Sequence, residues 1–158
     1  MKILVTGASG FIGSFIVEEA LRRGFDTWAA VRRSSSKAYL QDPRIHFIEL
    51  DLSSESRLTA QLEGHAFDYI VHAAGATKCL DKADFRRINT EGTQHLVSAM
   101  RTLQMPVRRF VFISSLSVMG AVRETEPHQD ILDSDTPLPC IRFGLLSFLG
   151  SIVPNTKR

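Results

Sequence analysis

Three glycines near the amino terminus have a spacing that can hold a phosphate group. The segment VTGASGFIG places Gly7, Gly10 and Gly13 directly after an apolar, strand-like run and directly before a helix-like run. The first glycine permits a tight turn, the second lets a pyrophosphate approach the backbone, and the third lets helix and sheet pack closely. Because N–H groups at a helix start attract anions, this junction predicts a dinucleotide-binding loop, with a plain strand-helix turn as the alternative.

A pair of arginines stands where the second expected strand ends. NAD-preferring sites carry an acid there that bonds the ribose 2′-hydroxyl, but the segment AAVRRSSS offers Arg32 and Arg33 instead, and Asp26 lies at the other end of the strand. A guanidinium can bind a phosphate dianion through two hydrogen bonds. We therefore expect NADP(H) as the cofactor, with Arg32 as first choice for the 2′-phosphate. The alternatives are NAD and two solvated surface arginines.

Short apolar runs alternate with longer amphipathic runs, and these elements must position the residues above. We expect strands over residues 2–6, 27–31, 45–50, 69–73 and 109–113, and helices over residues 11–23, 53–62 and 84–103. The first helix has Phe11, Phe15, Ala20 and Leu21 as its apolar residues, and Ser53 caps the second. Apolar strands between helices indicate an α/β fold with a doubly wound parallel sheet. Right-handed crossovers favour a Rossmann-like order 3-2-1-4-5, which we expect to be incomplete at its C-terminal side.

Several motifs, taken in order, resemble the extended branch of the short-chain dehydrogenase/reductase superfamily. That branch includes nucleotide-sugar epimerases and dehydratases, dihydroflavonol reductases and 3β-hydroxysteroid dehydrogenases. Besides TGASGFIG, the segments ELDLSS, VHAAGAT, NTEGTQHLVSAM and FVFISSLSVMG match the branch. The resemblance covers residues 1–139 and implies an NAD(P)-binding Rossmann domain there. It implies cofactor contacts from Gly7, Ser9, Gly10, Phe11, Ile12, Gly13, Asp51, Leu52, Ala73, Ala74, Gly75 and Ser114, with Asp51 and Leu52 bordering the adenine.

The resemblance also implies a serine, a tyrosine and a lysine that couple proton transfer to hydride transfer. It places the serine on Ser115, and it makes Asn89 the asparagine that helps to organise the lysine. Phe143 and Ser147 stand where the tyrosine and the lysine are expected. From the residues alone, the alternative for Ser115 is a hydroxyl that caps a strand end, and the alternative for Asn89 is a helix amide that bonds locally.

Residues 140–158 form an atypical apolar tail in place of the helix that should carry the tyrosine and lysine. Three hypotheses account for it: an incomplete or altered copy of an enzyme, for which a frameshift near Cys140 is one route; a non-catalytic NADP-sensing module; or a chain whose partner copy supplies the missing groups. We favour the first, with carbonyl/alcohol oxidoreduction on a small organic molecule as the parent reaction and no activity in this chain alone. The runner-up is an NAD-dependent nucleotide-sugar epimerase or dehydratase.

Composition excludes several other classes of function. The net charge of +2 and the dispersed basic residues argue against a nucleic-acid partner. Cys79 and Cys140 lack metal or redox spacing, and the five histidines lack paired ligand spacing, so we expect no metal site. His72 and His128 are interpreted as structural or solvated. Since the amino terminus lacks signal-peptide features and the apolar tail is shorter than the about 20 residues needed to span a bilayer, we expect a cytoplasmic protein with no membrane partner.

Overall fold

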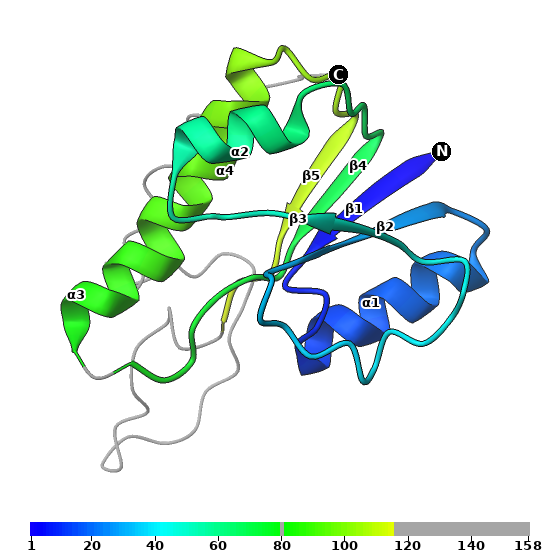
Figure 1. The fold of residues 1–158 in the computed structure, drawn as a ribbon, viewed down its shortest axis with the longest axis horizontal. Coiled ribbons are helices and arrows are strands. Elements are labelled where there is room, and N and C mark those ends of the chain that lie inside the picture. Colours follow the sequence, from blue (N-terminus) through cyan, green and yellow to red (C-terminus); the bar gives the residue numbers. More distant parts are fainter. Residues whose placement is uncertain (80, 116–158) are drawn as a thin grey trace, which may run out of the picture.

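One parallel sheet organises the chain (Figure 1). The computed structural model describes residues 1–79 and 81–115. The strands are β1 (Lys2–Thr6), β2 (Asp26–Val31), β3 (His46–Glu49), β4 (Tyr69–His72) and β5 (Arg109–Phe112). Their order is β3-β2-β1-β4-β5, as predicted, and each strand end lies within one residue of its predicted position. Because all the strands run parallel, their last residues meet along one side of the sheet, called the carboxyl edge below.

Helices cover the two faces of the sheet and create two separate cores. Helix α1 (Phe11–Arg22) packs on one face against β1 and β2, whereas α2 (Glu55–Leu62) and α4 (Gly92–Thr102) lie against each other on the opposite face (Figure 1). Alternate residues of β1 serve the two cores, with Ile3 and Val5 toward α1 and Leu4 toward α2 and α4. This double burial explains why the strands are apolar throughout. No helix within the described residues is long and apolar enough to cross a membrane.

Helix α1 buries Ala20 and Leu21, as predicted, but not the two phenylalanines that were expected beside them. Its buried residues are Gly13, Val17, Ala20 and Leu21. Phe11 and Phe15, which we expected on the apolar side, are 75% and 58% exposed and contact each other edge to face. The cause is the close approach of Gly13 to the Gly7 carbonyl, where a side chain would find no space. This contact fixes which face of the helix points inward, so the prediction for the two phenylalanines is wrong.

The single helix predicted over residues 84–103 is three consecutive segments. It begins earlier, at α3 (Lys82–Phe85), continues as a π-helical turn η1 (Arg86–Glu91), and ends as α4. The Asp81 carboxylate caps the start by accepting a hydrogen bond from the Asp84 N–H at 2.7 Å. The wider turn lies where the Asn89 side chain reaches across to the loop that follows β4. π turns of this kind often mark functional positions in helices.

Candidate functional site

The loop between β1 and α1 is a tight cradle built around its glycines. Gly7 has a φ of 69°, and a Cβ there would lie 2.6 Å from the backbone of Ala73 and Ala74. A Cβ on Gly13 would lie 2.1 Å from the Gly7 carbonyl oxygen. The Gly10 N–H closes the turn by donating to that oxygen at 2.9 Å. Backbone packing therefore requires a glycine at the first and third positions, while the second position is more open.

The amino end of α1 supplies hydrogen-bond donors beside this cradle. Gly10 occupies the N-cap position without a side-chain cap, and the first turn contains no acidic residue. The N–H groups of Phe11, Ile12 and Gly13 lie in this turn, where a helix offers them no carbonyl partner. The positive end of the helix dipole adds to their attraction for an anion. This geometry fits a pyrophosphate, as the glycine spacing predicts.

Arg32 and Arg33 follow β2 at the carboxyl edge. Both are exposed, and within residues 1–79 and 81–115 neither forms an ion pair. The Arg32 N–H donates to the Ser35 hydroxyl at 3.0 Å, and the Ser35 N–H donates to the Arg32 carbonyl at 2.9 Å, which fixes the turn. Asp26 lies at the opposite end of β2, as predicted, and accepts from the Trp28 indole at 3.2 Å. The end of β2 is therefore cationic.

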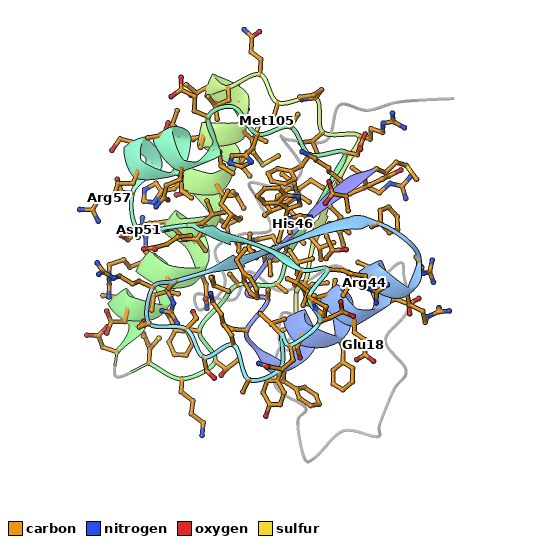
Figure 2. The ribbon with its side chains drawn as sticks, turned by 45° about the vertical axis from the view of Figure 1, so that its right-hand side comes forward. Glu18, Arg44, His46, Asp51, Arg57 and Met105 are labelled. Carbon is orange, nitrogen blue, oxygen red and sulfur yellow. The ribbon has the colours of Figure 1, made fainter. Side chains whose placement is uncertain are left out.

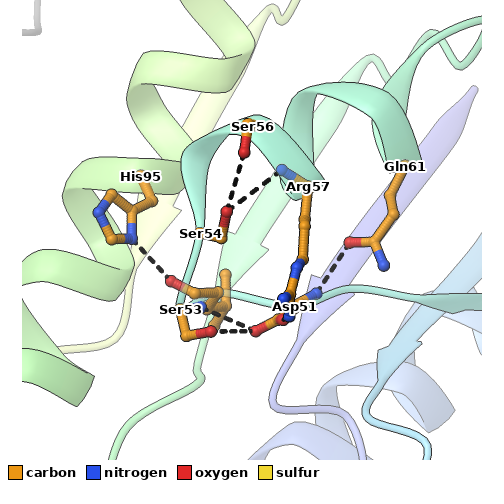
Figure 3. A network of polar contacts seen from close by, with 8 residues as sticks. Asp51, Ser53, Ser54, Ser56, Arg57, Gln61 and His95 are labelled. Atoms are coloured by element: carbon orange, nitrogen blue, oxygen red, sulfur yellow. Dashed lines mark hydrogen bonds and ion pairs between the residues drawn. The ribbon is translucent and has the colours of Figure 1, made fainter.

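Asp51 follows β3 and holds its carboxylate in a fixed network (Figure 3). One oxygen accepts from the Ser53 hydroxyl at 2.6 Å and the Ser53 N–H at 3.0 Å, and the other accepts from Arg57 at 2.7 Å. The Ser53 and Arg57 hydrogen bonds lower the pKa of Asp51 to about 2. Figure 2 shows Asp51 and Arg57 together near α2, on the other side of the sheet from Glu18. Because its pKa is lowered, the Asp51 carboxylate is ionised at neutral pH.

Helix α2 begins one residue later than predicted, because its N-cap is Ser54 and not Ser53. Ser53, the predicted N-cap, is engaged with Asp51, and the Ser54 hydroxyl caps the helix by accepting from the Arg57 N–H at 3.4 Å. The Leu52 carbonyl lies 2.9 Å from the His95 Nδ1 atom of α4 (Figure 3). The segment proposed to border the adenine is therefore tied to both helices on its side of the sheet.

Asn89 fastens the loop that follows β4. Its Oδ1 atom accepts from the Ala76 N–H at 2.6 Å, and its Nδ2 atom donates to the Ala76 carbonyl at 3.0 Å. A Cβ on Gly75 would lie 3.2 Å from the same Oδ1 atom. The amide thus bonds a loop 13 residues away, so the alternative of a locally bonded helix asparagine is wrong. The arrangement holds Ala73, Ala74 and Gly75 at the carboxyl edge.

A buried histidine, His72, lies beneath this loop and was not among the residues predicted for the site. His72 is the last residue of β4 and 1% exposed, so of the two predicted possibilities, structural or solvated, the solvated one is wrong. Its Nδ1 atom lies 2.6 Å from the Thr6 hydroxyl and its Nε2 atom 2.8 Å from the Thr93 hydroxyl. Burial lowers the pKa of His72 to about 4. A lone histidine in a strand gives no sign of such partners, but the pairing of β1 with β4 would have placed Thr6 opposite it.

Ser114 and Ser115 follow β5, next to the end of β4. The Ile113 N–H donates to the His72 carbonyl at 3.0 Å, and both serines beyond it are exposed. Phe143, Ser147 and the polar segment 121–139 lie outside the described residues. Within residues 1–79 and 81–115, no three His, Cys, Asp or Glu side chains are placed to hold a metal ion. The carboxyl edge thus gathers the glycine loop, the arginine pair, Asp51, the Ala73 loop and the two serines.

Comparison with known proteins relates this arrangement to one family. The model of the NAD dependent epimerase/dehydratase family matches residues 3–141. A UDP-glucose 4-epimerase from Klebsiella pneumoniae is 35% identical over 131 residues, which cover 76% of this chain and 93% of that protein. A decarboxylating sterol-4-alpha-carboxylate 3-dehydrogenase from Candida albicans is 28% identical over 146 residues, which cover 87% of this chain and 39% of that protein.

A solved structure shows the same fold. The Thermus thermophilus UDP-glucose 4-epimerase, in complex with NAD, has a TM-score of 0.75 and 24% sequence identity. The match covers 96% of this chain and 50% of that one. The chain therefore spans half or less of the length of the C. albicans and T. thermophilus proteins.

Proposed function

The chain belongs to the NAD dependent epimerase/dehydratase family, and we propose that its residues 1–139 bind NADP(H) at the carboxyl edge of the sheet. The observation that carries the proposal is the exposed pair Arg32 and Arg33, which has no ion-pair partner among the described residues. It stands where an NAD site would carry an acid. The planar guanidinium group matches a phosphate dianion, and the exposed edge lets the phosphate keep part of its hydration.

The other residues at the edge fit the remaining parts of a dinucleotide. The first-turn N–H groups of α1, together with the open position at Gly10, receive the pyrophosphate. Asp51 and Leu52 border the adenine, where the ionised Asp51 carboxylate can accept a hydrogen bond from an amino group. Ala73, Ala74 and Gly75 line the half of the dinucleotide beyond the point where strand order reverses between β1 and β4. Ser9 and Ser114 complete the proposed contacts.

We propose carbonyl/alcohol oxidoreduction as the parent reaction, in which the bound nicotinamide supplies or accepts the hydride. Ser115 hydrogen-bonds the oxygen atom of the substrate. The similarity to a C. albicans dehydrogenase supports a redox reaction. The chain alone does not turn over, because Phe143 has no proton to transfer and Ser147 supplies no positive charge. Residues 140–158 form a separate segment that takes the place of the catalytic helix.

A second candidate is an NAD-containing nucleotide-sugar epimerase or dehydratase. The K. pneumoniae relative, a UDP-glucose 4-epimerase that is 35% identical, favours it. The two candidates differ in a simple observation. The epimerase candidate requires NAD(H) to bind more tightly than NADP(H) and a UDP-sugar to raise the melting temperature of the protein, whereas the NADP(H) proposal requires the opposite order of cofactor affinities.

The proposal is tested by removing each arginine and titrating both reduced cofactors by fluorescence. Arg32→Ala should weaken NADPH binding roughly 10- to 100-fold, because a hydrogen bond to a charged group contributes about 1.5–3 kcal/mol. Arg33→Ala should have a smaller effect in the same direction, and NADH affinity should change little in either variant. Arg44→Ala is the matched control, because Arg44 is also exposed but is paired with Asp42. Equal losses of NADPH and NADH affinity, or no loss of either, would overturn the proposal.

A further inference from the structure

A chain of buried hydrogen bonds runs through His72, and its proton positions are determined by its partners. The Thr93 hydroxyl donates its one hydrogen to the Asn89 carbonyl at 2.8 Å, so it can only accept from His72. The His72 Nε2 atom, 2.8 Å away, therefore carries the imidazole proton. The Nδ1 atom is then an acceptor, and the Thr6 hydroxyl donates to it at 2.6 Å. His72 is thus neutral and bonded at both nitrogens.

Both ends of this hydrogen-bond network reach the loop that follows β4. At one end, the Ala74 N–H points to the Thr6 hydroxyl oxygen at 3.4 Å. At the other end, Asn89 carries the contact onward, because its side chain makes both hydrogen bonds to the Ala76 backbone. One imidazole therefore connects two fixed points of a single short loop. These points flank Gly75, whose backbone lies against the Asn89 amide.

The surroundings of the imidazole keep it in one state. Its ring lies 6.1 Å from the Phe110 ring and 5.8 Å from the Phe112 ring, measured between centroids. Burial among these groups lowers the pKa of His72 to about 4, so the ring stays neutral at physiological pH. A protonated ring would place a hydrogen on Nδ1, where the Thr6 hydroxyl now donates. Each hydrogen bond of this buried network therefore has one fixed donor and one fixed acceptor.

We propose that His72 is a positioning residue for the dinucleotide, because it fixes residues 73–76 against the half of the ligand that lies over β4. This inference rests on the proposed function, since it supposes that a dinucleotide binds at the carboxyl edge. In a doubly wound sheet the two halves of the ligand lie on either side of the strand-order switch. Arg32 and Asp51 follow β2 and β3, on the adenosine side, and the loop held by His72 follows β4.

A positioning role predicts that a His72 substitution affects the binding of two ligands differently. Replacing His72 should weaken a complete dinucleotide, which contacts the loop. It should leave the affinity for adenosine 2′,5′-bisphosphate unchanged, since that fragment reaches only the adenosine side. A purely structural histidine would affect both ligands alike or neither. The contrast between the two ligands is therefore a readout that loss of stability alone does not produce.

Two conservative replacements restore the two halves of the network separately. The Oδ1 atom of an asparagine can lie close to the present Nδ1 position and accept from Thr6. The amide nitrogen of a glutamine can lie close to the present Nε2 position and donate to Thr93. His72→Asn therefore keeps the contact toward Ala74, and His72→Gln keeps the contact toward Asn89. His72→Phe keeps the ring volume and removes both contacts.

The experiment uses the full chain and titrates NADPH and adenosine 2′,5′-bisphosphate against wild type and the three His72 variants. Phe67→Leu is the control for stability, because Phe67 is 1% exposed and lies just before the amino end of β4, opposite to the carboxyl edge. We expect His72→Phe to weaken NADPH at least about tenfold, with the asparagine and glutamine variants intermediate. The affinity for the bisphosphate should change less than about twofold in all of them, which is under about 0.4 kcal/mol. Phe67→Leu should lower the melting temperature without changing either affinity.

The possible outcomes separate this inference from the proposal beneath it. If wild type binds neither ligand, the proposed function fails and this inference fails with it. If wild type binds NADPH and the His72 variants bind it equally well, only the positioning role is overturned. Equal loss of both ligands would also overturn it, because that result indicates a structural role. If His72→Phe does not fold, the intermediate affinities expected for the asparagine and glutamine variants decide the question.

Discussion

Replacing Gly13 by alanine should disrupt the cradle without removing any hydrogen-bonding group. The added Cβ would lie 2.1 Å from the Gly7 carbonyl oxygen, 2.7 Å from the Gly7 carbonyl carbon and 2.9 Å from the Ala8 Cα atom. All three are backbone atoms, so no flexible side chain can move aside. The helix start must shift by roughly 1 Å to reach ordinary contact distances. Because overpacking of a dense interior costs about 1–3 kcal/mol, we expect a loss near the upper end of that range, about 3 kcal/mol.

Urea unfolding monitored by circular dichroism measures this loss, with two other glycines as references. Gly10→Ala should cost less, because its Cβ would meet only the Gly7 carbonyl oxygen, at 3.2 Å. Gly92→Ala is the matched control, since its nearest contact is the Leu52 Cβ atom at 3.5 Å. It should be neutral or stabilise the protein by up to about 1 kcal/mol, because alanine favours a helix. A Gly13→Ala unfolding free energy within about 0.5 kcal/mol of wild type would refute the close packing described here.

Three further perturbations test other parts of the structure. The folded-state pKa of His72, about 4, lies below its ordinary value of 6.5, so its contribution to stability is present above pH 6.5 and is lost as pH falls toward 4. Between pH 7 and pH 5 this amounts to about 2 kcal/mol of unfolding free energy, and urea titrations of His72→Gln should lack that component; an unchanged pH dependence would contradict the assignment. Asn89→Ala should cost about 1–3 kcal/mol and speed hydrogen exchange at the Ala76 amide, since both of its hydrogen bonds disappear. Unaltered protection of that amide would show that the loop is held by other contacts. Phe15→Ser should change the unfolding free energy by less than about 0.5 kcal/mol, whereas Val17→Ala in the buried stripe should cost about 1–3 kcal/mol; the reverse order would restore the predicted orientation of α1.

The strand order could be predicted because it depends on features that short segments carry by themselves. Runs such as KILVT are buried on both faces, and this double burial leaves them without alternation. Parallel strands and right-handed crossovers then leave few topologies. The glycine loop was equally readable, because its spacing, its strand and its helix are adjacent in the sequence.

The orientation of α1 and the break in the long helix depend on contacts between distant segments. Counting apolar residues placed Phe11 and Phe15 on the apolar side of the helix, but the approach of Gly13 to the Gly7 carbonyl decides which side faces inward. The π turn coincides with the reach of Asn89 to Ala76, a contact that helix periodicity does not reveal. In each case a contact with another segment of the chain outweighs the local pattern.

Most residues of the candidate site could be predicted from the sequence, but the hydrogen bonds between them could not. The sequence already places Arg32 and Arg33 at the end of a strand, and the structure adds that they are exposed and have no ion pair among the described residues. The roles of Thr6 and Thr93 emerge only when the pairing of β1 with β4 and the packing of α4 place them on either side of His72.

Isothermal titration calorimetry of the unmodified chain with NADPH and with NADH tests the central claim most directly. The proposed site places the ribose 2′-phosphate at a cationic strand end, Arg32 and Arg33, that has no acid. It therefore predicts that NADPH binds at least about tenfold more tightly than NADH, a difference of about 1.4 kcal/mol. Equal affinities, or tighter binding of NADH, would contradict it.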